Sequence, residues 1–159
     1  MKPLRILTIE DKKEEAILRQ KSLAVKPEEL SKKDLKDFLD ALLHSAKNSE
    51  EPAGGIAAPQ VGVHKRIFYI LNYDTNRWEL FINPEIEPIG YTKKAIPEAC
   101  LSVPNREEKV LRYYKIKVKF LDKNGKRKVK KYEDLNSISI QHEYDHLEGV
   151  LFIDKILKE

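Results

Sequence analysis

Apolar side chains in the first third of the chain recur with the period of an α-helix. Within residues 31–47 they form one stripe of a helical surface: Leu35, Phe38, Leu39, Leu42, Leu43 and Ala46. This stripe predicts an amphipathic helix, because residues three or four positions apart lie on the same helical face. Ser31, followed by Asp34, is expected to cap its N-terminus, and Asn48 its C-terminus. A shorter helical turn is expected over residues 11–21.

Shorter apolar runs in the middle of the chain predict strands. Residues 66–71 and 78–82 are expected to form two strands, and residues 85–89 to extend the same sheet. The Asn-Pro pair at 83–84 is expected to interrupt them. Residues 50–62, which are rich in Gly, Ala and Pro, are expected to form an irregular loop.

A basic hairpin is predicted next. Residues 109–131 include eleven Lys or Arg residues and a single acid. Residues 114–120 alternate strictly between apolar and lysine side chains, which predicts a half-buried strand with lysines on its outer face. Asn124-Gly125 predicts a tight turn, and residues 126–132 return as the partner strand. We favour lysines that protect an edge strand over an RNA-contacting surface, although the two roles are compatible.

A second helix is predicted near the end of the chain. It extends over residues 134–148, with Asp134 as N-cap and Gly149 in the left-handed conformation after its end. The apolar residues 150–153 are expected to form a short strand or tail. Two helices bracket mostly antiparallel strands, so we predict an α+β fold in which antiparallel sheets pack around the second helix. The length suits one domain spanning residues 1–159.

Composition restricts the class of protein. No apolar run approaches the ~20 residues of a membrane span, and the N-terminus is unlike a secretory signal. The single cysteine, Cys100, excludes an intramolecular disulfide. We therefore expect a cytoplasmic protein without membrane contact. The net charge of +4 raises the question of nucleic acid, but the basic excess is confined to the hairpin, and no stable nucleic-acid complex is expected.

The candidate chemistry lies on the second helix, in the sequence His142-Glu143-Tyr144-Asp145-His146. Residues four apart share one helical face, so both imidazoles are able to bind one metal ion. Glu143 lies beside that face, where its carboxylate reaches a metal-bound water rather than the ion. The chain has only four histidines, which makes a chance match to this pattern a weak explanation.

A catalytic site of this type needs a third protein ligand and keeps one coordination position open for water. The acids that follow His146 are Glu148, Asp154 and Glu159. Glu148 is too close along the same helix to reach the same ion, and the other two lie in a short tail. The third ligand is therefore expected upstream, where Cys100 is the candidate.

Three segments resemble, in the same order, the motifs of the peptide deformylase family. They are residues 53–60 (AGGIAAPQ), 98–102 (EACLS) and 141–149 (QHEYDHLEG). The family patterns are G-x-G-Φ-A-A-x-Q, E-G-C-L-S and Q-H-E-x-D-H-L-x-G. The third motif matches completely, whereas Ala53 and Ala99 each replace a glycine in the other two.

This resemblance implies a metal-dependent hydrolase that removes the formyl group from N-formylmethionyl nascent peptides and releases formate. One divalent ion would be held by Cys100, His142 and His146. Members of the family commonly bind Fe(II), with Zn(II) and Ni(II) as alternatives. A metal-bound water would attack the formyl carbonyl, with Glu143 acting first as general base and then as general acid.

Further residues are implied by the resemblance alone. The Gln60 side-chain amide and the Leu101 backbone N–H would stabilise the oxyanion. The Gly55-Ile56 backbone would pair with an extended substrate. The methionine pocket would be lined by Ile96, Leu135, Ile138 and Ser139. An ion pair between Glu98 and Arg112 would brace the cysteine loop. The implied partner is the nascent peptide, with at most a transient ribosome contact.

Two other interpretations of the same residues stay open. A small metallopeptidase with the H-E-x-x-H pattern would act on unblocked peptides, but it leaves the first two motifs unexplained. A basic RNA-binding protein with a structural metal would need a fourth protein ligand, and the spare histidines are His44, on a helix face, and His64.

Overall fold

The computed structural model describes residues 1–158 of the chain. Within these residues the α-helices are α1 (Lys12–Leu18), α2 (Lys33–Lys47) and α3 (Asp134–Leu147). Short 3₁₀ turns occupy Pro27–Glu29, Ala58–Val61 and Phe152–Lys155. Across residues 1–158, no helix combines the length and apolar character that a bilayer span requires.

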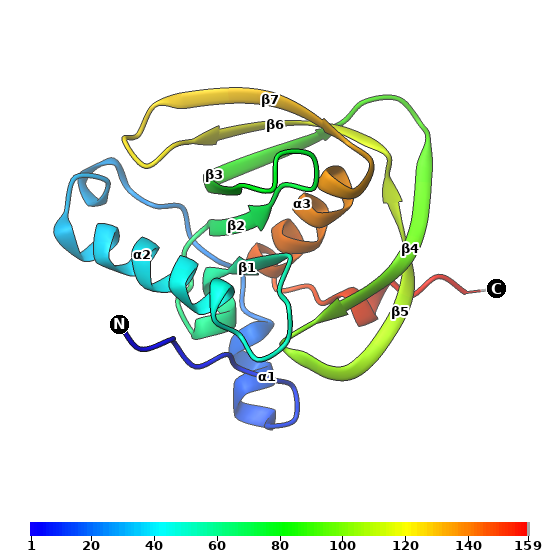
Figure 1. Ribbon diagram of the computed structural model, residues 1–159, viewed down its shortest axis with the longest axis horizontal. Coiled ribbons are helices and arrows are strands. Elements are labelled where there is room, and N and C mark those ends of the chain that lie inside the picture. The colour runs from blue at the N-terminus through cyan, green and yellow to red at the C-terminus, as the bar shows by residue number, and fades with distance from the viewer. Residues whose placement is uncertain (159) are drawn as a thin grey trace.

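Two antiparallel sheets enclose α3. The larger has the order β1-β2-β3-β6-β7, with bounds β1 (Gly55–Ala57), β2 (Ile67–Leu71), β3 (Trp78–Pro88), β6 (Lys115–Leu121) and β7 (Arg127–Glu133). The smaller pairs β4 (Lys93–Cys100) with β5 (Val103–Tyr113). Figure 1 shows α3 in the middle of the molecule, with the larger sheet along one side and the β4–β5 ribbon along the other. The predicted α+β class with antiparallel sheets is confirmed.

The apolar stripe of α2 is buried against the larger sheet. Its buried side chains include Leu35, Leu39, Leu42 and Ala46, which pack with residues of β1 and β2 such as Ile56 and Ile67. The amphipathic helix is therefore confirmed, and Asn48 is its C-cap as predicted, but the predicted N-cap, Ser31, is wrong. The helix begins at Lys33, and Lys32 occupies the N-cap position without a side-chain hydrogen bond. The segment just before it is held in a tight turn, where the Lys32 N–H donates to the Glu29 carbonyl (3.1 Å).

Two predictions about the first strands need correction. Residues 50–62 are not wholly irregular, because β1 and a 3₁₀ turn form within them. A strand of three residues is too short to show the alternation of apolar and polar side chains by which longer strands are recognised in a sequence. The Asn-Pro pair at 83–84 does not end the strand but forms a bulge in β3, where the register shifts between Ile82 and Glu85. Asn83 adopts φ 50° there, and its side chain bonds to the main chain of Val25.

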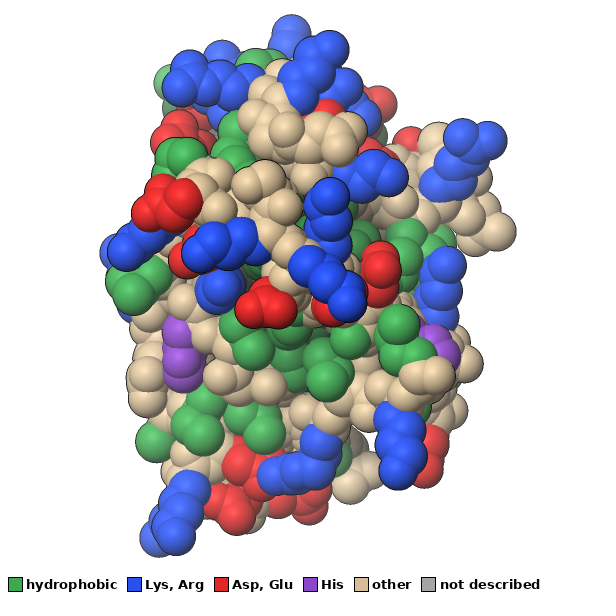
Figure 2. Space-filling model, turned by 90° about the vertical axis from the view of Figure 1, so that its left-hand side faces the viewer, with side chains coloured by type: hydrophobic (Ala, Val, Ile, Leu, Met, Phe, Trp, Pro, Cys, Tyr) green, Lys and Arg blue, Asp and Glu red, His purple; other side chains and the backbone are tan. Residues whose placement is uncertain are grey.

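The basic hairpin forms as predicted from β6 and β7, with Lys115 opposite Glu133 and Leu121 opposite Arg127. At its turn only Gly125 has a positive φ (78°). Asn124 does not share that conformation, so this is not the two-residue turn that the Asn-Gly pair suggested. Figure 2 shows Lys and Arg side chains gathered at the top of the molecule, the end occupied by β6 and β7 in Figure 1.

The second predicted helix is confirmed as α3, with a difference at its N-cap and another in the segment that follows it. Asp134 is not its N-cap, since its carboxylate accepts from Lys94 Nζ (2.7 Å) and Glu133 occupies the cap position. Gly149 adopts φ 74° after the helix, as expected. The following apolar residues form neither strand nor free tail, because Phe152 begins a 3₁₀ turn and is buried.

Candidate metal centre and active site

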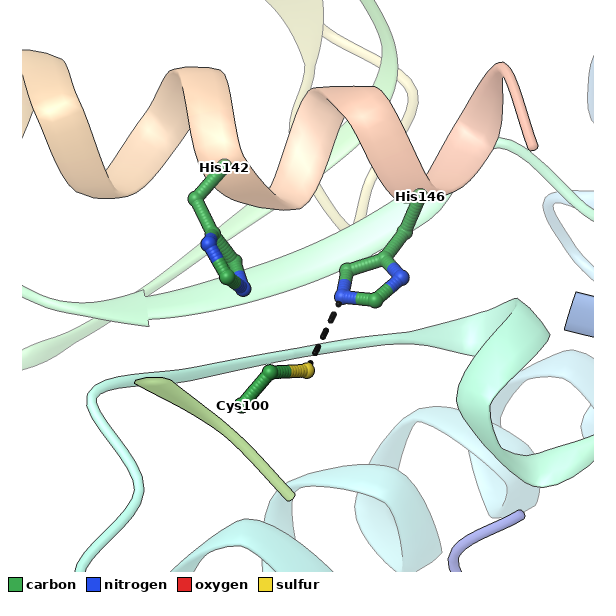
Figure 3. Close-up of side chains that lie close together, drawn as sticks. All are labelled: Cys100, His142 and His146. Atoms are coloured by element: carbon green, nitrogen blue, oxygen red, sulfur yellow. Dashed lines mark hydrogen bonds between the residues drawn. The ribbon is translucent and has the colours of Figure 1, made fainter. Parts of the chain in front are cut away.

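Two histidines of α3 and the cysteine at the end of β4 meet beside the helix. His142 and His146 project from one face of α3 toward Cys100, as Figure 3 shows. The Cys100 Sγ atom lies 3.4 Å from His146 Nε2, and one ligand atom from each of the three residues lies within 4.8 Å of the other two. Cys100 lies two residues after Glu98 on β4, so the two side chains share the face of the strand that is directed toward the helix. Two segments far apart in sequence thus contribute one cluster.

The chemistry and spacing of these three donors fit a divalent metal ion. A thiolate and two imidazoles are a ligand set of zinc and other first-row metals. Metal–sulfur and metal–nitrogen bonds of about 2.3 and 2.0–2.1 Å at a tetrahedral angle place their two donor atoms about 3.6 Å apart. The 3.4 Å between Cys100 Sγ and His146 Nε2 is close to that separation. Three ligands leave the fourth position for a water or a substrate.

A buried network of charges orients His142. Its Nδ1 atom lies 2.9 Å from Glu98 Oε1, so Nδ1 carries the proton and Nε2 is free to bind the ion. Arg112 donates two hydrogen bonds of 2.9 Å to the Glu98 carboxylate and a third, of 2.6 Å, to Asp145. Burial alone would raise the pKa of Glu98, but the hydrogen bonds from His142 and Arg112 hold it below its usual value. The predicted Glu98–Arg112 ion pair is confirmed.

The environments of Glu143 and His146 suit their chemistry. Burial raises the pKa of Glu143 to about 7, and its Oε1 atom has no hydrogen-bond partner among the described residues. A carboxyl group that titrates near neutrality suits general acid–base catalysis. Burial also pushes the pKa of His146 well below its usual value, so its imidazole is neutral, the form that binds metal.

Gly55 leaves room for the Glu143 carboxylate. A Cβ atom on Gly55 would lie 2.6 Å from Glu143 Oε2, closer than non-bonded atoms approach. The second glycine of the first motif is therefore explained by close packing on the Glu143 carboxylate, rather than by its backbone conformation.

A cleft of about 420 Å³ opens beside these groups. It is lined by the metal-ligand candidates Cys100 and His142 and by the Glu143 carboxylate. The predicted substrate and oxyanion residues that also line it are Gly55, Gln60, Ile96, Leu101, Leu135, Ile138 and Ser139. His146 lies deeper, with 1% of its surface exposed. The structure therefore brings the sequence-predicted residues together around one cavity, with Ile56 as the exception.

The edge of β1 explains the exception. The Gly54 carbonyl accepts from the last residue of β2 (2.9 Å), and the Ala57 N–H donates instead to the Gln60 side chain (2.9 Å). Successive residues of an antiparallel strand direct their main-chain groups alternately to the partner and away from it. The Gly55 N–H and C=O therefore face the free edge of β1, whereas those of Ile56 face β2. The Ile56 side chain is fully buried beneath α2.

Gln60 is held in one orientation at the cleft. Its Oε1 atom accepts from the Ala57 N–H, and its Nε2 atom donates to Ser102 Oγ at 3.1 Å. The same Nε2 atom lies 3.5 Å from Cys100 Sγ, next to the metal-ligand cluster. An amide donor therefore lies in the cleft wall, beside the metal-ligand cluster.

Three residues of the site escaped the sequence analysis. Ser102 orients Gln60, Asp145 completes the Arg112 network, and Tyr73, 58% exposed, stands at the cleft wall. Asp145 and Ser102 lie inside quoted motifs, and their position there was the available signal. Tyr73 comes from the β2–β3 connection, which carries no motif.

Comparison with known proteins agrees with this geometry. A model of the polypeptide deformylase family matches residues 3–159. Peptide deformylase 1 of Clostridium perfringens is 45% identical over 124 residues, which cover 76% of this chain and 83% of that protein. Peptide deformylase of Pseudomonas aeruginosa is 40% identical over 130 residues, covering 81% of this chain and 76% of that protein.

Solved structures extend the similarity to the whole fold. Peptide deformylase from Thermotoga maritima superposes with a TM-score of 0.88 at 30% identity, covering 99% of this chain and 100% of that chain. The class I type b enzyme from Acinetobacter baumannii was solved with Met-Ala-Ser bound. It superposes with a TM-score of 0.87 at 28% identity, covering 98% of this chain and 99% of that chain. These relatives do not favour the peptidase or the RNA-binding interpretation. The chain belongs to the peptide deformylase family and is a metal-dependent hydrolase that removes the N-formyl group from nascent polypeptides.

Proposed function

We propose that this cleft cleaves the formyl C–N bond of N-formylmethionyl peptides at an ion held by Cys100, His142 and His146. The observation that carries the assignment is the buried Glu143 carboxylate, with one unpartnered oxygen, next to three convergent metal-ligand atoms at a substrate-sized cleft. A bound divalent ion supplies Lewis acidity and makes water nucleophilic near neutral pH.

Glu143 moves the proton. Its carboxylate takes a proton from the attacking water and later returns it to the departing amine, so that formate and a free N-terminus result. A pKa of about 7 supports both roles, because the group neither holds nor releases its proton too strongly at neutral pH. Gly55 keeps the space around it open.

Gln60 and Leu101 stabilise the oxyanion of the tetrahedral intermediate. The Gln60 Nε2 atom is already held in place by Ser102, which means that little reorganisation accompanies the reaction. The Leu101 backbone N–H follows the cysteine directly, and Leu101 lines the cleft. A single donor of this kind contributes about 10²–10³-fold to kcat in other hydrolases.

The remaining cleft residues bind the peptide. Gly55 offers its free main-chain edge to an extended substrate, in the manner of an added strand. The side chain of the formylated methionine enters the part of the cleft lined by Ile96, Leu135, Ile138 and Ser139. The Met-Ala-Ser bound to the Acinetobacter baumannii relative is a peptide of the kind that deformylation releases, which supports this use of the cleft.

We infer Fe(II) as the native ion, with Zn(II) and Ni(II) as alternatives, since one thiolate and two imidazoles accept each of them. The substrate is made on ribosomes, which supports action in the cytoplasm and a transient ribosome contact. We also propose that residues 1–159 form one catalytic domain, because the site draws on segments from residue 54 to residue 146.

Two variants separate metal binding from chemistry. His146→Ala removes a ligand and is expected to lose the ion, whereas Glu143→Gln keeps it and loses about 10²–10⁴-fold in kcat. Metal content by mass spectrometry and formate release are measured on each protein after anaerobic reconstitution with Fe(II), Zn(II) or Ni(II). Stoichiometric metal in His146→Ala would refute the ligand set, and near-normal kcat in Glu143→Gln would refute the assigned base.

A further inference from the structure

An exposed tyrosine forms part of the cleft wall. Tyr73 belongs to the connection between β2 and β3, and it lines the same cavity as Gly55 and Glu143. More of its surface faces solvent than is buried, so its ring is accessible to a molecule in the cleft. Aromatic side chains in such positions offer a large contact area to a ligand.

The loop that carries Tyr73 is fixed to α3 by two buried asparagines. The Tyr73 N–H donates to Asn136 Oδ1 (2.8 Å), and Asn136 Nδ2 donates to Asn72 Oδ1 (3.0 Å). The same Asn72 oxygen accepts from the Asp74 N–H (2.8 Å). Buried amides are costly unless their hydrogen bonds are made, so this network holds the loop in one conformation. The main chain at Tyr73 is therefore a fixed support for the ring.

The free edge of β1 gives the direction of a bound peptide. Gln60, which follows β1, lies 3.5 Å from Cys100 Sγ through its Nε2 atom, so the reacting formyl group belongs at that end. Gly54 precedes β1, and a Cβ atom on it would lie 3.4 Å from the Tyr73 hydroxyl oxygen. A peptide that pairs with the Gly55 edge and has its formyl group at the metal ligands therefore extends toward Tyr73.

The position of Tyr73 along α3 leads to the same conclusion. Asn136, which binds the Tyr73 N–H, precedes His142 by six residues and His146 by ten. These separations correspond to about 9 and 15 Å along the helix axis. Figure 1 shows the β2–β3 connection beside the N-terminal end of α3. Both elements thus place Tyr73 at the end of the cleft that is remote from the metal ligands.

The third residue of an extended peptide is the one within reach of the ring. Its Cα atom lies about 9 Å from the formyl carbon. Side chains of an extended chain alternate between two faces, so the first and third residues project to the same side. The methionine side chain projects toward Leu135, Ile138 and Ser139 of α3. The third side chain therefore also projects toward α3, further from the metal ligands, where Asn136 holds Tyr73.

We propose that Tyr73 determines specificity for the third residue of the formyl peptide, by offering its ring to an apolar or aromatic side chain there. The proposal rests on the proposed function, which gives the peptide its direction in the cleft. The contact is remote from the bond that breaks, so it stabilises the bound substrate and the transition state equally. It therefore lowers KM and leaves kcat unchanged. A contact between two aromatic rings strengthens binding about 3–10-fold.

Three peptides and two variants test the proposal. Formate release is measured from the C-terminal amides of formyl-Met-Ala, formyl-Met-Ala-Ser and formyl-Met-Ala-Phe, with metal-reconstituted parent, Tyr73→Ala and Tyr73→Phe. In the parent, kcat/KM for the Phe peptide should exceed that for the Ser peptide about 3–10-fold, through KM. Tyr73→Ala should abolish this preference and leave kcat/KM for formyl-Met-Ala within about twofold of the parent. Tyr73→Phe should keep the preference, because it retains the ring.

Tyr91→Ala is the matched control. Tyr91 is 97% exposed, lies between β3 and β4, and does not line the cleft. Its replacement should leave all three kcat/KM values unchanged. Isothermal titration calorimetry with the products Met-Ala-Ser and Met-Ala-Phe repeats the comparison without turnover. The parent should bind Met-Ala-Phe about 3–10-fold more tightly than Met-Ala-Ser, whereas Tyr73→Ala should bind the two equally.

Three results would overturn the proposal. They are a parent without preference between the Ser and Phe peptides, a preference that persists in Tyr73→Ala, and a loss in Tyr73→Ala that is as large for formyl-Met-Ala as for the longer peptides. The last result would place Tyr73 in the methionine pocket. A parent that binds the products with the expected preference but releases no formate would contradict the proposed function instead.

Discussion

Replacement of Arg112 by methionine is expected to destabilise the protein strongly. Arg112 is 3% exposed, and its guanidinium contacts two buried carboxylates, Glu98 and Asp145. The methionine side chain occupies a similar volume but carries no charge. It therefore leaves the Glu98 carboxylate buried without its cation, whereas Asp145 keeps its contact with Lys155 (3.1 Å). Removing one partner of a buried ion pair typically costs about 3–5 kcal/mol.

The magnitude converts into a measurable melting shift. An unfolding entropy of about 2.1 cal/mol/K per residue gives roughly 0.33 kcal/mol/K for 159 residues, so each kcal/mol lowers the Tm by about 3 °C. The Arg112→Met variant is therefore expected to melt about 9–15 °C below the parent. Its metal affinity should also fall about 10–100-fold, because Glu98, which orients His142, loses its two hydrogen bonds from Arg112.

The matched control is Arg106→Met on the same strand. The Arg106 side chain is 44% exposed, and its contact with Glu108 is 3.5 Å long. Exposed pairs of this kind contribute at most about 1 kcal/mol. Both variants and the parent are reconstituted with metal and denatured with urea at equal ion concentration. The measurement gives the free energy of unfolding of each protein. A decrease in Arg112→Met no larger than in Arg106→Met would refute the description of this network.

Three further variants test separate parts of the structure. Gly55→Ala should push the Glu143 carboxylate aside and lower kcat at least tenfold while the metal stays bound; kcat within threefold of the parent, at normal metal content, would contradict the packing argument. Ser139→Phe should reduce the preference for formyl-Met over formyl-Ala peptides by about 10–200-fold, and an unchanged ratio of kcat/KM values would place the methionine pocket elsewhere. Gly149→Ala should lower the free energy of unfolding by about 2–4 kcal/mol, because the new Cβ would collide with the Arg19 carbonyl at the C-cap of α1. Gly90 has a similar φ (75°) but open space around it, so Gly90→Ala should lower that free energy by only about 1 kcal/mol.

The elements with strong local patterns were predictable from the sequence. The apolar stripe of α2 recurs with the period of a helix, and the alternating lysines of β6 recur with the period of a strand. The spacing of His142 and His146 fixes their common face whatever surrounds the helix. Cys100 followed because the residues after His146 could not supply a third ligand.

The features that were missed depend on contacts between distant segments. Ser31 and Asp134 have the chemistry of N-caps. Ser31, however, lies in the turn that precedes α2, and the carboxylate of Asp134 binds Lys94 instead of the helix N-terminus. The sequence analysis gave Asp145 no role, because only the approach of β5 makes it a partner of Arg112. Such outcomes are decided by tertiary structure, which local propensity does not encode.

The most direct test of the account is formate release from formyl-Met-Ala-Ser by the protein reconstituted with Fe(II) under anaerobic conditions. We predict one formate for each Met-Ala-Ser produced, no cleavage of the Met–Ala bond, and a kcat at least 100-fold lower in a Glu143→Gln variant with the same metal content. A metal-replete protein that releases no formate, or one that cleaves unformylated Met-Ala-Ser instead, would contradict the account.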